Sequence, residues 1–246
     1  MLSGNSPASG GRRRRRRATL GALAAAGLLA LSPPLAAQSA ADDAGTFRVS
    51  IGGHPVGTEE FTIRQVGVGA TAEVTAVGRV RLDLPTGTLD LQPRLRTTGF
   101  QADPVGYEII AGGDAQRRIS GSIGGGRFSA RILTATGEQM REYVASAGAT
   151  VLDDGVAHHY YFLARRTRTG RVPILIPREH RQVMATVRSL GEERITIDGT
   201  TLDLFRLVVT PDGGDERHVW VDALNRVIRV EIPAAGYLAV RTEIPR

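Results

Sequence analysis

Histidine, serine and acidic side chains are the residues of this chain that could carry out chemistry, and their spacing decides which chemistry. The histidines lie far apart except for one adjacent pair, at His54, His158, His159, His180 and His218. Neighbouring side chains on a helix point about 100° apart, so His158 and His159 cannot easily share a metal ion. Glu179-His180 lacks the second half of a zinc-protease motif. We therefore expect no metal site and interpret the histidines as helix-end or surface residues.

Motifs for other kinds of chemistry are incomplete. Ser122 stands in a glycine-rich stretch, but Ser120 occupies the position where a nucleophile elbow needs its first glycine. Gly67-Val68-Gly69 resembles the start of a dinucleotide-binding fingerprint, yet a strand pattern follows where that motif needs a helix. The chain has no cysteine, which excludes thiol chemistry and cysteine–metal sites. The sequence thus indicates no catalytic residue and no cofactor.

The first 37 residues have the composition of a secretory signal peptide. Arg12–Arg17 is an unbroken basic run, Ala18–Leu31 is apolar, and a small-residue segment ends at Ala37. The apolar stretch is 14 residues long, whereas a membrane-spanning helix needs about 20. We expect cleavage after Ala37, no membrane span in the cleaved protein, and a periplasmic or secreted product.

Removing this segment changes the charge of the chain. All 31 basic residues are arginines, six of them lie in Arg12–Arg17, and no acidic residue precedes Asp42. The remainder therefore carries 25 basic and 25 acidic residues. A chain with no net charge lacks the basic footprint of a nucleic-acid-binding protein. We expect no nucleic-acid partner, and the sequence does not indicate an oligomeric state.

From Thr46 onward, apolar and polar residues alternate with the period of a β-strand. Stretches such as "TFRVSI" (46–51), "GRVRLDL" (78–84) and "RVIRVEI" (226–232) place one face toward a core and the other toward water. Strands of this kind are typical of antiparallel sheets. We predict a mainly β protein with a single domain over residues 46–246, preceded by a flexible segment at residues 38–45.

One segment, "GVAHHYYFLARR" at residues 155–166, departs from this alternation. Its apolar side chains recur three and four residues apart, which predicts a helix with a broad apolar face. We place this helix at about residues 154–166, with Asp153 or Asp154 as its N-terminal cap. Because the helix has few charges before its end, it must be buried, and the concave face of a curved sheet is its expected partner.

Aromatic residues gather late in the chain, in this helix and after it. Their simplest role is core packing, because aromatic side chains bury large areas. The functional alternative is an apolar pocket between the helix and the sheet, which would suit a hydrophobic or lipid-like ligand. For such a pocket, the expected lining residues are Tyr160, Leu163, Trp220 and Tyr237.

Three segments of the chain, taken together, form a pattern of turns, strands and a helix that can be compared with a protein family. They are a strand–turn–strand with the pattern Gly-x-x-x-Gly-Thr at 50–63, the helical segment at 152–166, and closing hairpins at 193–244. Together they resemble an uncharacterised family of exported bacterial proteins. The resemblance implies one curved antiparallel sheet, a half-barrel or open barrel, wrapped around one short helix. It brings no catalytic residues, and this chain has Val227-Ile228 where many members carry Leu-Pro.

This implied fold is similar to the half-barrel lipoprotein carriers of the bacterial envelope, which hold acyl chains inside the half-barrel. We therefore predict an exported, non-enzymatic envelope protein that binds a lipid-like or apolar ligand between helix and sheet. Two alternatives stay open. One is an exported hydrolase whose acid/base residues come from separate strands, and the other is a structural or interaction scaffold that exposes its sheet edges.

Overall fold

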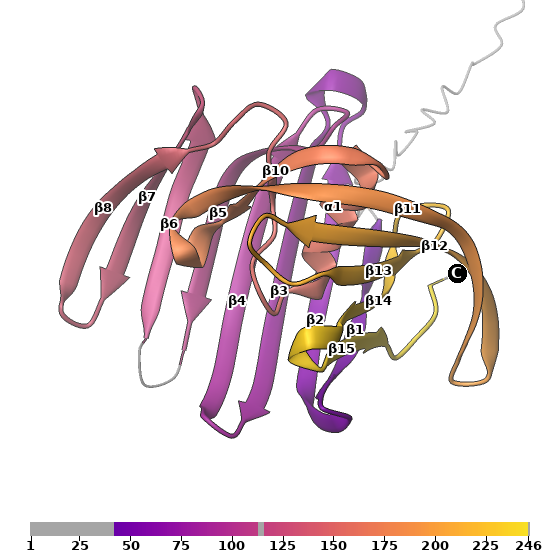
Figure 1. Cartoon of the computed structure of the whole chain (residues 1–246). Coiled ribbons are helices and arrows are strands. Elements are labelled where there is room, and N and C mark those ends of the chain that lie inside the picture. Colours follow the sequence, from indigo (N-terminus) through magenta and orange to yellow (C-terminus); the bar gives the residue numbers. More distant parts are fainter. Residues whose placement is uncertain (1–41, 113–115, 246) are drawn as a thin grey trace, which may run out of the picture. The chain divides into compact units, whose positions relative to one another are not determined.

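The computed structural model describes residues 42–112 and 116–245, and the signal peptide predicted for residues 1–37 lies outside them. The described chain is mainly β, as the alternation predicts, and forms one sheet of 15 strands (Figure 1). The first eight strands are β1 (Asp43–Ile51), β2 (His54–Val66), β3 (Glu73–Leu84), β4 (Gly87–Thr98), β5 (Asp103–Ala111), β6 (Arg117–Gly124), β7 (Arg127–Thr134) and β8 (Gly137–Val144). The others are β9 (Thr150–Val151), β10 (Gly170–Ile176), β11 (Arg181–Ile197), β12 (Thr200–Pro211), β13 (Arg217–Val221), β14 (Val227–Ile232) and β15 (Tyr237–Arg241).

The sheet grows in two directions from its middle. Its strand order is β8-β7-β6-β5-β4-β3-β2-β1-β15-β14-β13-β12-β11-β10-β9. β1 pairs with β2 on one side and with β15 on the other, so the first and last strands of the chain are neighbours. The described strands pair in antiparallel fashion except for β9 and β10, which are parallel. β8 and β9 remain as the two edges, which confirms the prediction of an open antiparallel sheet.

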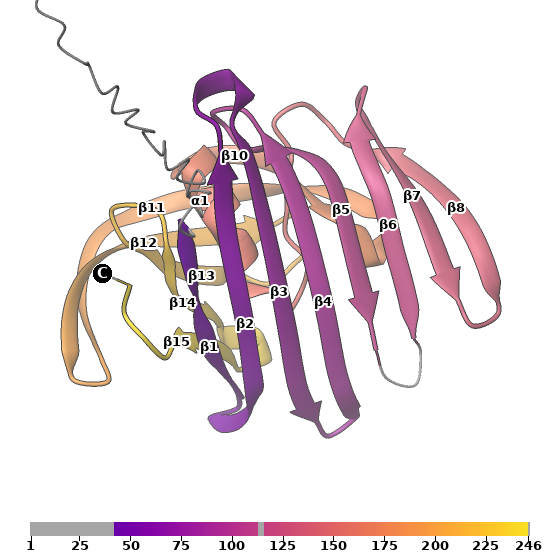
Figure 2. The same ribbon diagram turned by 180° about the vertical axis from the view of Figure 1, so that it is seen from behind.

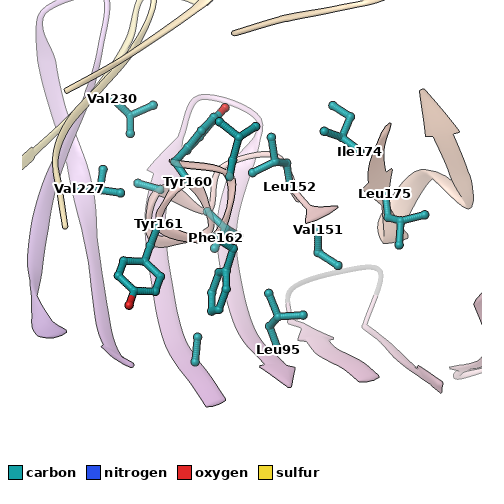
Figure 3. Packing of buried hydrophobic residues seen from close by; sticks show 14 of the residues in the cluster. Leu95, Val151, Leu152, Tyr160, Tyr161, Phe162, Ile174, Leu175, Val227 and Val230 are labelled. Atoms are coloured by element: carbon teal, nitrogen blue, oxygen red, sulfur yellow. The ribbon is translucent and has the colours of Figure 1, made fainter. Parts of the chain in front are cut away.

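The sheet bends back on itself around a short helix. In Figures 1 and 2, strands β10 to β13 pass across one face of the layer formed by the early strands, and α1 (Tyr160–Arg166) lies between them. Inward-facing residues of both layers and of α1 form one apolar cluster (Figure 3). The core therefore lies inside the curve, because alternation along each strand sends every second side chain there.

The helix is shorter than the sequence predicts. A 3₁₀ turn at Ala157–His159 comes first, and α1 itself has seven residues. A helix of this length is not stable alone in water, so the buried side chains of Tyr160–Ala164 must hold it in place. Complete burial of a residue such as Leu163 contributes about 2 kcal/mol. No helix in the described residues has the length and hydropathy needed to cross a membrane.

Several strands lie where the sequence predicts none, namely β5, β6, β8, β9, β10 and the first part of β11. β8 shows the reason, because nearly all of its side chains are exposed on both faces. A strand without a buried face has no alternation of apolar and polar residues. Backbone pairing with β7 alone makes this segment a strand. At the other end of the fold, β1 begins at Asp43, three residues before the predicted start of the domain.

A second, smaller apolar cluster lies on the outer face of the sheet. It contains Ile197, Leu204, Trp220 and Ile228. The first two come from the far half of the β11–β12 hairpin, whose pairing shifts between Ser189 and Glu192. At the tip of this hairpin, Asp198 accepts hydrogen bonds from Arg48 of β1 at 3.3 and 3.4 Å. The hairpin therefore folds over the outer face of β13, β14 and β15, and contacts β1.

Candidate functional site

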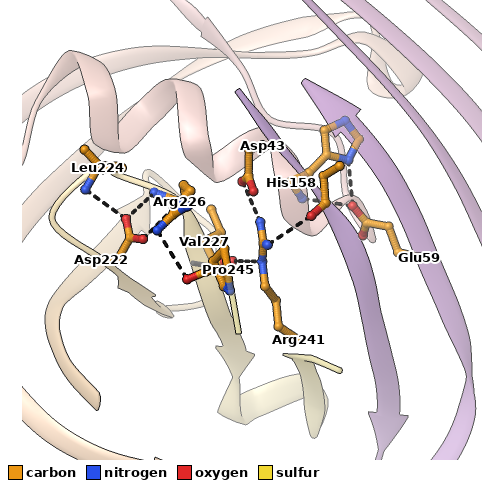
Figure 4. A network of polar contacts seen from close by, with 10 residues as sticks. Asp43, Glu59, His158, Asp222, Leu224, Arg226, Val227, Arg241 and Pro245 are labelled. Carbon is orange, nitrogen blue, oxygen red and sulfur yellow. Dashed lines mark hydrogen bonds and ion pairs between the residues drawn. The ribbon is translucent and has the colours of Figure 1, made fainter. Parts of the chain in front are cut away.

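A buried carboxylate on β2 holds the start of the helical segment. The Glu59 side chain has no exposed surface. It accepts hydrogen bonds from the backbone N–H groups of Ala157 (2.7 Å) and His158 (2.9 Å), and its Oε1 lies 2.6 Å from Nδ1 of His158 (Figure 4). The first N–H groups of a helix have no partner within the helix. Glu59 therefore caps this segment from a distant strand.

This arrangement differs from the cap that the sequence predicts. Neither Asp153 nor Asp154 makes a side-chain hydrogen bond to the first turn, and no side-chain cap of the segment is present at its own N-cap residues. The Asp153 carboxylate instead accepts hydrogen bonds from Tyr107 and Arg178, and the Asp154 carboxylate accepts one from Arg217. The prediction was wrong because a carboxylate 98 residues earlier in the chain reaches the same N–H groups.

Local backbone geometry brings β2 to this position. Gly57 belongs to the Gly-x-x-x-Gly-Thr pattern and has a φ of +152°. A Cβ atom there would lie 1.9 Å from the carbonyl oxygen of Arg81, so only glycine permits the close approach of β2 to β3. Gly78 on β3 has a related role, because its Cβ would lie 2.6 Å from Cε1 of His158. Gly78 therefore makes room for the His158 ring, and Gly57 lets β2 approach β3.

The second histidine lies at the start of the helix, one of the two expected places, but it is buried and not at the surface. His159 accepts a hydrogen bond at Nδ1 from the backbone N–H of Asp153 at 3.3 Å. Its ring meets those of His158 and Tyr107 edge-on, with centroid distances of 4.7 and 5.7 Å. Burial, then the neighbouring His158 and Arg178, lower the pKa of His159 well below 6.5. We conclude that this imidazole is neutral in the folded protein.

Two further polar anchors secure the same region. Tyr107 of β5 donates to Asp153 at 2.8 Å, and Arg178 donates through Nε to the other oxygen of that carboxylate at 2.8 Å. Burial raises the pKa of Asp153, and the Arg178 guanidinium partly offsets this effect. Arg217 of β13 donates to the hydroxyl of Tyr160 at 3.1 Å and to Asp154 at 2.8 Å.

A buried ion pair joins the two ends of the chain. Arg241 of β15 donates to the carboxylate of Asp43 on β1, and its Nε donates to the carbonyl of Val227 at 2.7 Å (Figure 4). The guanidinium lies over the rings of Phe61 and Phe47, 4.8 and 5.7 Å from their centroids. Burial raises the pKa of Asp43 despite this partner. The contact fastens β1 to β15 in the middle of the sheet.

The Glu59–His158 pair has the composition of a general acid/base site but not its accessibility. A general base must reach a substrate proton directly or through one water molecule. Both side chains have zero exposed surface, and helical N–H groups occupy the carboxylate. Among the described residues, His, Asp and Glu side chains form no group that could hold a metal ion. The geometry supports a structural role for the pair.

The structure brings together three of the four residues that the sequence predicts as pocket lining. Tyr160, Leu163 and Tyr237 are buried in the main apolar cluster. Trp220 lies on the opposite face of the sheet, in the outer cluster. There its indole N–H donates to Glu193 at 2.9 Å. Trp220 follows Val219 and precedes Val221, which face the core, so alternation directs its side chain outward.

Several hollows of the described residues lie away from these four side chains. Five hollows in residues 42–112 and 116–245 have volumes between about 340 and 570 Å³, and none of them is lined by the four predicted residues. The largest of these lies beside Arg241 and the residues that follow β15. Another lies over the outer face of β4, β5 and β6. Tyr160 and Leu163 themselves are buried, with exposed fractions of 4% and 0%.

Sequence reasoning missed the polar anchors, although a signal for them exists. Glu59 has the same parity as Phe61 and Ile63 in β2, so it falls on the apolar face of that strand. Arg217 likewise shares the parity of Val219 in β13. A charged residue in the apolar phase of a strand must find a buried partner. That pattern could have identified these residues, but not their partners.

Comparisons with known proteins give one structural likeness. No protein-family model matches the chain, and no curated protein matches it. A crystal structure of a β-barrel-like protein with a domain of unknown function, DUF1849, from Brucella abortus aligns with a TM-score of 0.48 and 10% sequence identity. The alignment covers 82% of this chain and 94% of that one. At this level of similarity, the likeness carries no inference about function.

Proposed function

We propose that this chain is an exported, non-enzymatic envelope protein that works through its outer surfaces, while its helix-filled interior is a structural core. The observation that carries the proposal is the state of the helical segment. Its apolar side chains are buried. The N–H groups that have no partner within the helix donate to Glu59, and the neighbouring charge of Asp154 is bonded by Arg217. Such a segment leaves neither a reactive group nor an empty apolar space for a small molecule.

Export is supported by the basic, apolar and small-residue order of residues 1–37. Expression of the full chain in a Gram-negative host, followed by cell fractionation and N-terminal sequencing, tests it. We expect the processed protein in the periplasmic fraction with Gln38 as its first residue. An unprocessed chain that stays in the cytoplasm would contradict this part of the proposal.

A lipid-like ligand between helix and sheet is the competing function, and one observation favours it. Tyr160, Leu163 and Tyr237, which the sequence predicts as lining residues, share one apolar cluster. A ligand would have to displace them and break the bonds at Glu59, because the packing leaves no vacancy beside Leu163, whose exposure is zero. Entry of a ligand therefore requires the helix to leave the sheet.

Native mass spectrometry of the periplasmic protein separates these two functions. We expect the mass of the polypeptide alone, before and after incubation with fatty acids or phospholipids in detergent. A bound hydrophobe that Leu163→Asp removes, in a variant that keeps the far-UV circular dichroism of the parent, would establish the ligand-binding function instead. Leu224→Asp, at an exposed leucine outside the cluster, is the matched control for added charge.

A further inference from the structure

The outer face of the sheet carries arginines that no acid neutralises. Most outward arginines of the early strands are paired with acids, as Arg118 is with Glu108 and Arg131 is with Glu138. Among the described residues, the arginines without an ion pair, hydrogen bond or ring contact are Arg64, Arg94, Arg96 and Arg117. Three of these four belong to β2 and β4, and we call Arg64, Arg94 and Arg96 the outer arginine group.

The strand register places the outer arginine group in one small area. Arg64 pairs with Thr75, and Thr75 pairs with Arg96, so the two arginines lie in one row across β2, β3 and β4. Two strand spacings separate their Cα atoms by about 10 Å. Arg94 lies one outward position before Arg96 in β4. Three like charges this close repel one another, and an anion at the surface would relieve the repulsion.

A hollow adjoins two of these arginines. It has a volume of about 340 Å³, and its lining includes Arg94, Arg96, Gly106 and Glu108. Glu108 is the cross-strand neighbour of Arg94, but its carboxylate forms an ion pair with Arg118. Gly106 is paired with Arg96 across the ladder, and a Cβ at this position would lie 2.7 Å from the guanidinium nitrogen Nη2 of Arg96. The missing side chain therefore lets the guanidinium lie close to the sheet. Guanidinium groups bind phosphate oxygens in a bidentate manner.

An exposed apolar tip lies at the end of the same strands. Val66, Val68 and Phe100 have exposed fractions of 65%, 80% and 69%. Val66 ends β2, whereas Val68 and Phe100 lie in the β2–β3 and β4–β5 loops. These loops are joined by a hydrogen bond of 2.8 Å from the Gly99 N–H to the carbonyl of Ala72. The Phe100 ring lies 3.4 Å from the Cβ position of Gly69. We call Val66, Val68 and Phe100 the apolar tip.

The apolar tip and the outer arginine group are adjacent. Arg64 precedes Val66 by two residues and Arg96 precedes Phe100 by four, so the arginines lie about 7 to 13 Å behind the tip along the strands. Between them, Glu73 and Asp103 occupy the row that starts at Val66.

One of these two acids is already neutralised. Asp103 is bonded by Arg166 at 2.7 Å, which leaves Glu73 as the acid of this row without an ion pair among the described residues. The region around the tip therefore keeps an excess of positive charge.

These features fit one kind of partner. Large apolar side chains on loop tips enter the boundary between lipid headgroups and acyl chains, while cations behind them meet phosphate groups. We propose that the apolar tip and the outer arginine group form a docking surface for a phosphate-bearing lipid bilayer. This proposal rests on the surface function proposed above and names its partner.

Vesicle flotation tests the proposal directly. The protein is the chain from Gln38, which contains every described strand and both apolar clusters. Vesicles consist of phosphatidylcholine with phosphatidylglycerol, or of phosphatidylcholine alone. We expect co-flotation with the mixed vesicles at low salt, weaker binding to the neutral vesicles, and a decrease as salt is added because exposed charges are screened.

Two sets of variants separate the contributions, each with a matched control. Arg64→Gln, Arg94→Gln and Arg96→Gln together should weaken binding to the mixed vesicles by about ten-fold or more. The control triple removes the same charge from paired arginines of the same face, at Arg118, Arg127 and Arg131, and should keep most of the binding.

The apolar tip is tested in the same way. Its three residues are replaced by serine, and the control replaces exposed apolar residues of β7 and β8, at Leu133, Met140 and Val144. Loss of binding only in the tip variant supports the proposal. Equal binding by both arginine triples, or no flotation of the folded parent, overturns it.

A soluble polyanion distinguishes another class of partner. If dextran sulfate binds through the outer arginine group while vesicles do not, the partner is an anionic polymer and the bilayer proposal is wrong. In that case the proposal that the protein works through its outer surfaces still stands. A different result, an internal ligand in the native mass spectra, would contradict that proposal.

Discussion

On the inner face of β2, Glu59 has no exposed surface and accepts three hydrogen bonds from the start of the helical segment. On the outer face of the same strand, the next residue, Glu60, is exposed and makes no ion pair or side-chain hydrogen bond among the described residues. The side chains are chemically identical and differ only in parity. Burial therefore decides whether a carboxylate positions an element of the fold or remains free for contact at the surface.

The same contrast extends across the molecule. Buried charges at the helical segment and between β1 and β15 are all engaged by partners on distant elements. Outer charges pair with their cross-strand neighbours, or remain unpaired as in the outer arginine group. The inner charges therefore hold one structure, whereas the outer charges stay accessible at the surface.

The largest expected effect comes from removing the buried carboxylate. Glu59→Ala leaves three donors without an acceptor in the core, and breaking a buried charged contact in this way costs about 3–5 kcal/mol. Urea denaturation of this variant should show a much lower midpoint than that of the parent. Glu60→Ala is the matched control and should leave the midpoint nearly unchanged; equal effects of the two substitutions would refute the contrast.

A smaller effect is expected from adding one methyl group beside His158. Gly78→Ala places Cβ 2.6 Å from the His158 ring, so the ring or the strand must shift, at a cost of about 1–3 kcal/mol. Gly124→Ala provides the control, because the Cβ there meets no atom within 4 Å. Thermal unfolding of both variants measures the difference. A Gly78→Ala protein as stable as the Gly124→Ala protein would show that the ring is not held in place.

Two buried groups near the start of the helical segment, His159 and Asp153, should make the stability of the protein depend on pH. His159 has a folded-state pKa well below its ordinary value of 6.5. Below pH 6.5 the unfolded chain therefore takes up a proton that the folded protein refuses, and stability falls by at most about 1.4 kcal/mol per pH unit. Asp153 has a raised pKa and acts in the opposite sense, adding stability as the pH falls through its folded value toward 3.8.

His159→Gln tests this assignment, since an amide oxygen can still accept the Asp153 N–H but does not titrate. Denaturation midpoints measured from neutral pH downward should fall less steeply for the variant than for the parent. Parallel curves would mean that other groups set the acid response.

The smallest effect is expected on the outer face. Arg194 and Asp203 form an exposed pair at 2.8 Å between β11 and β12. Solvent screening leaves such pairs little influence on stability, so Arg194→Gln should not shift the urea midpoint measurably. A clear loss of stability would place this outer pair among the structural contacts.

Much of the fold follows from sequence patterns, and particular residues show where this ends. Alternation in segments such as 78–84 and 226–232 predicts strands with one buried face, and the departure at 155–166 predicts the single buried helix. β8 was not predictable, since neither of its faces is apolar. The signal peptide at 1–37 stays a prediction.

The site was harder to predict because its contacts join residues far apart in the chain. Tyr160, Leu163 and Tyr237 lie in the same buried cluster, while Trp220 faces outward because its parity differs from that of its neighbours. The Glu59 cap depends on a carboxylate about 100 residues before the helix, and no local pattern specifies such a pairing. Whether any of the four predicted residues contacts a ligand stays a prediction.

Hydrogen exchange of the helical segment tests the central claim most directly. If α1 and the turn before it are a fixed part of the core, the amides of Ala157, His158 and Tyr160–Arg166 exchange only when the whole protein unfolds. Their protection should then equal that of β2 and fall in Glu59→Ala. Fast exchange of these amides in the parent protein, with β2 still protected, would show a helix that opens from the sheet and would contradict the account.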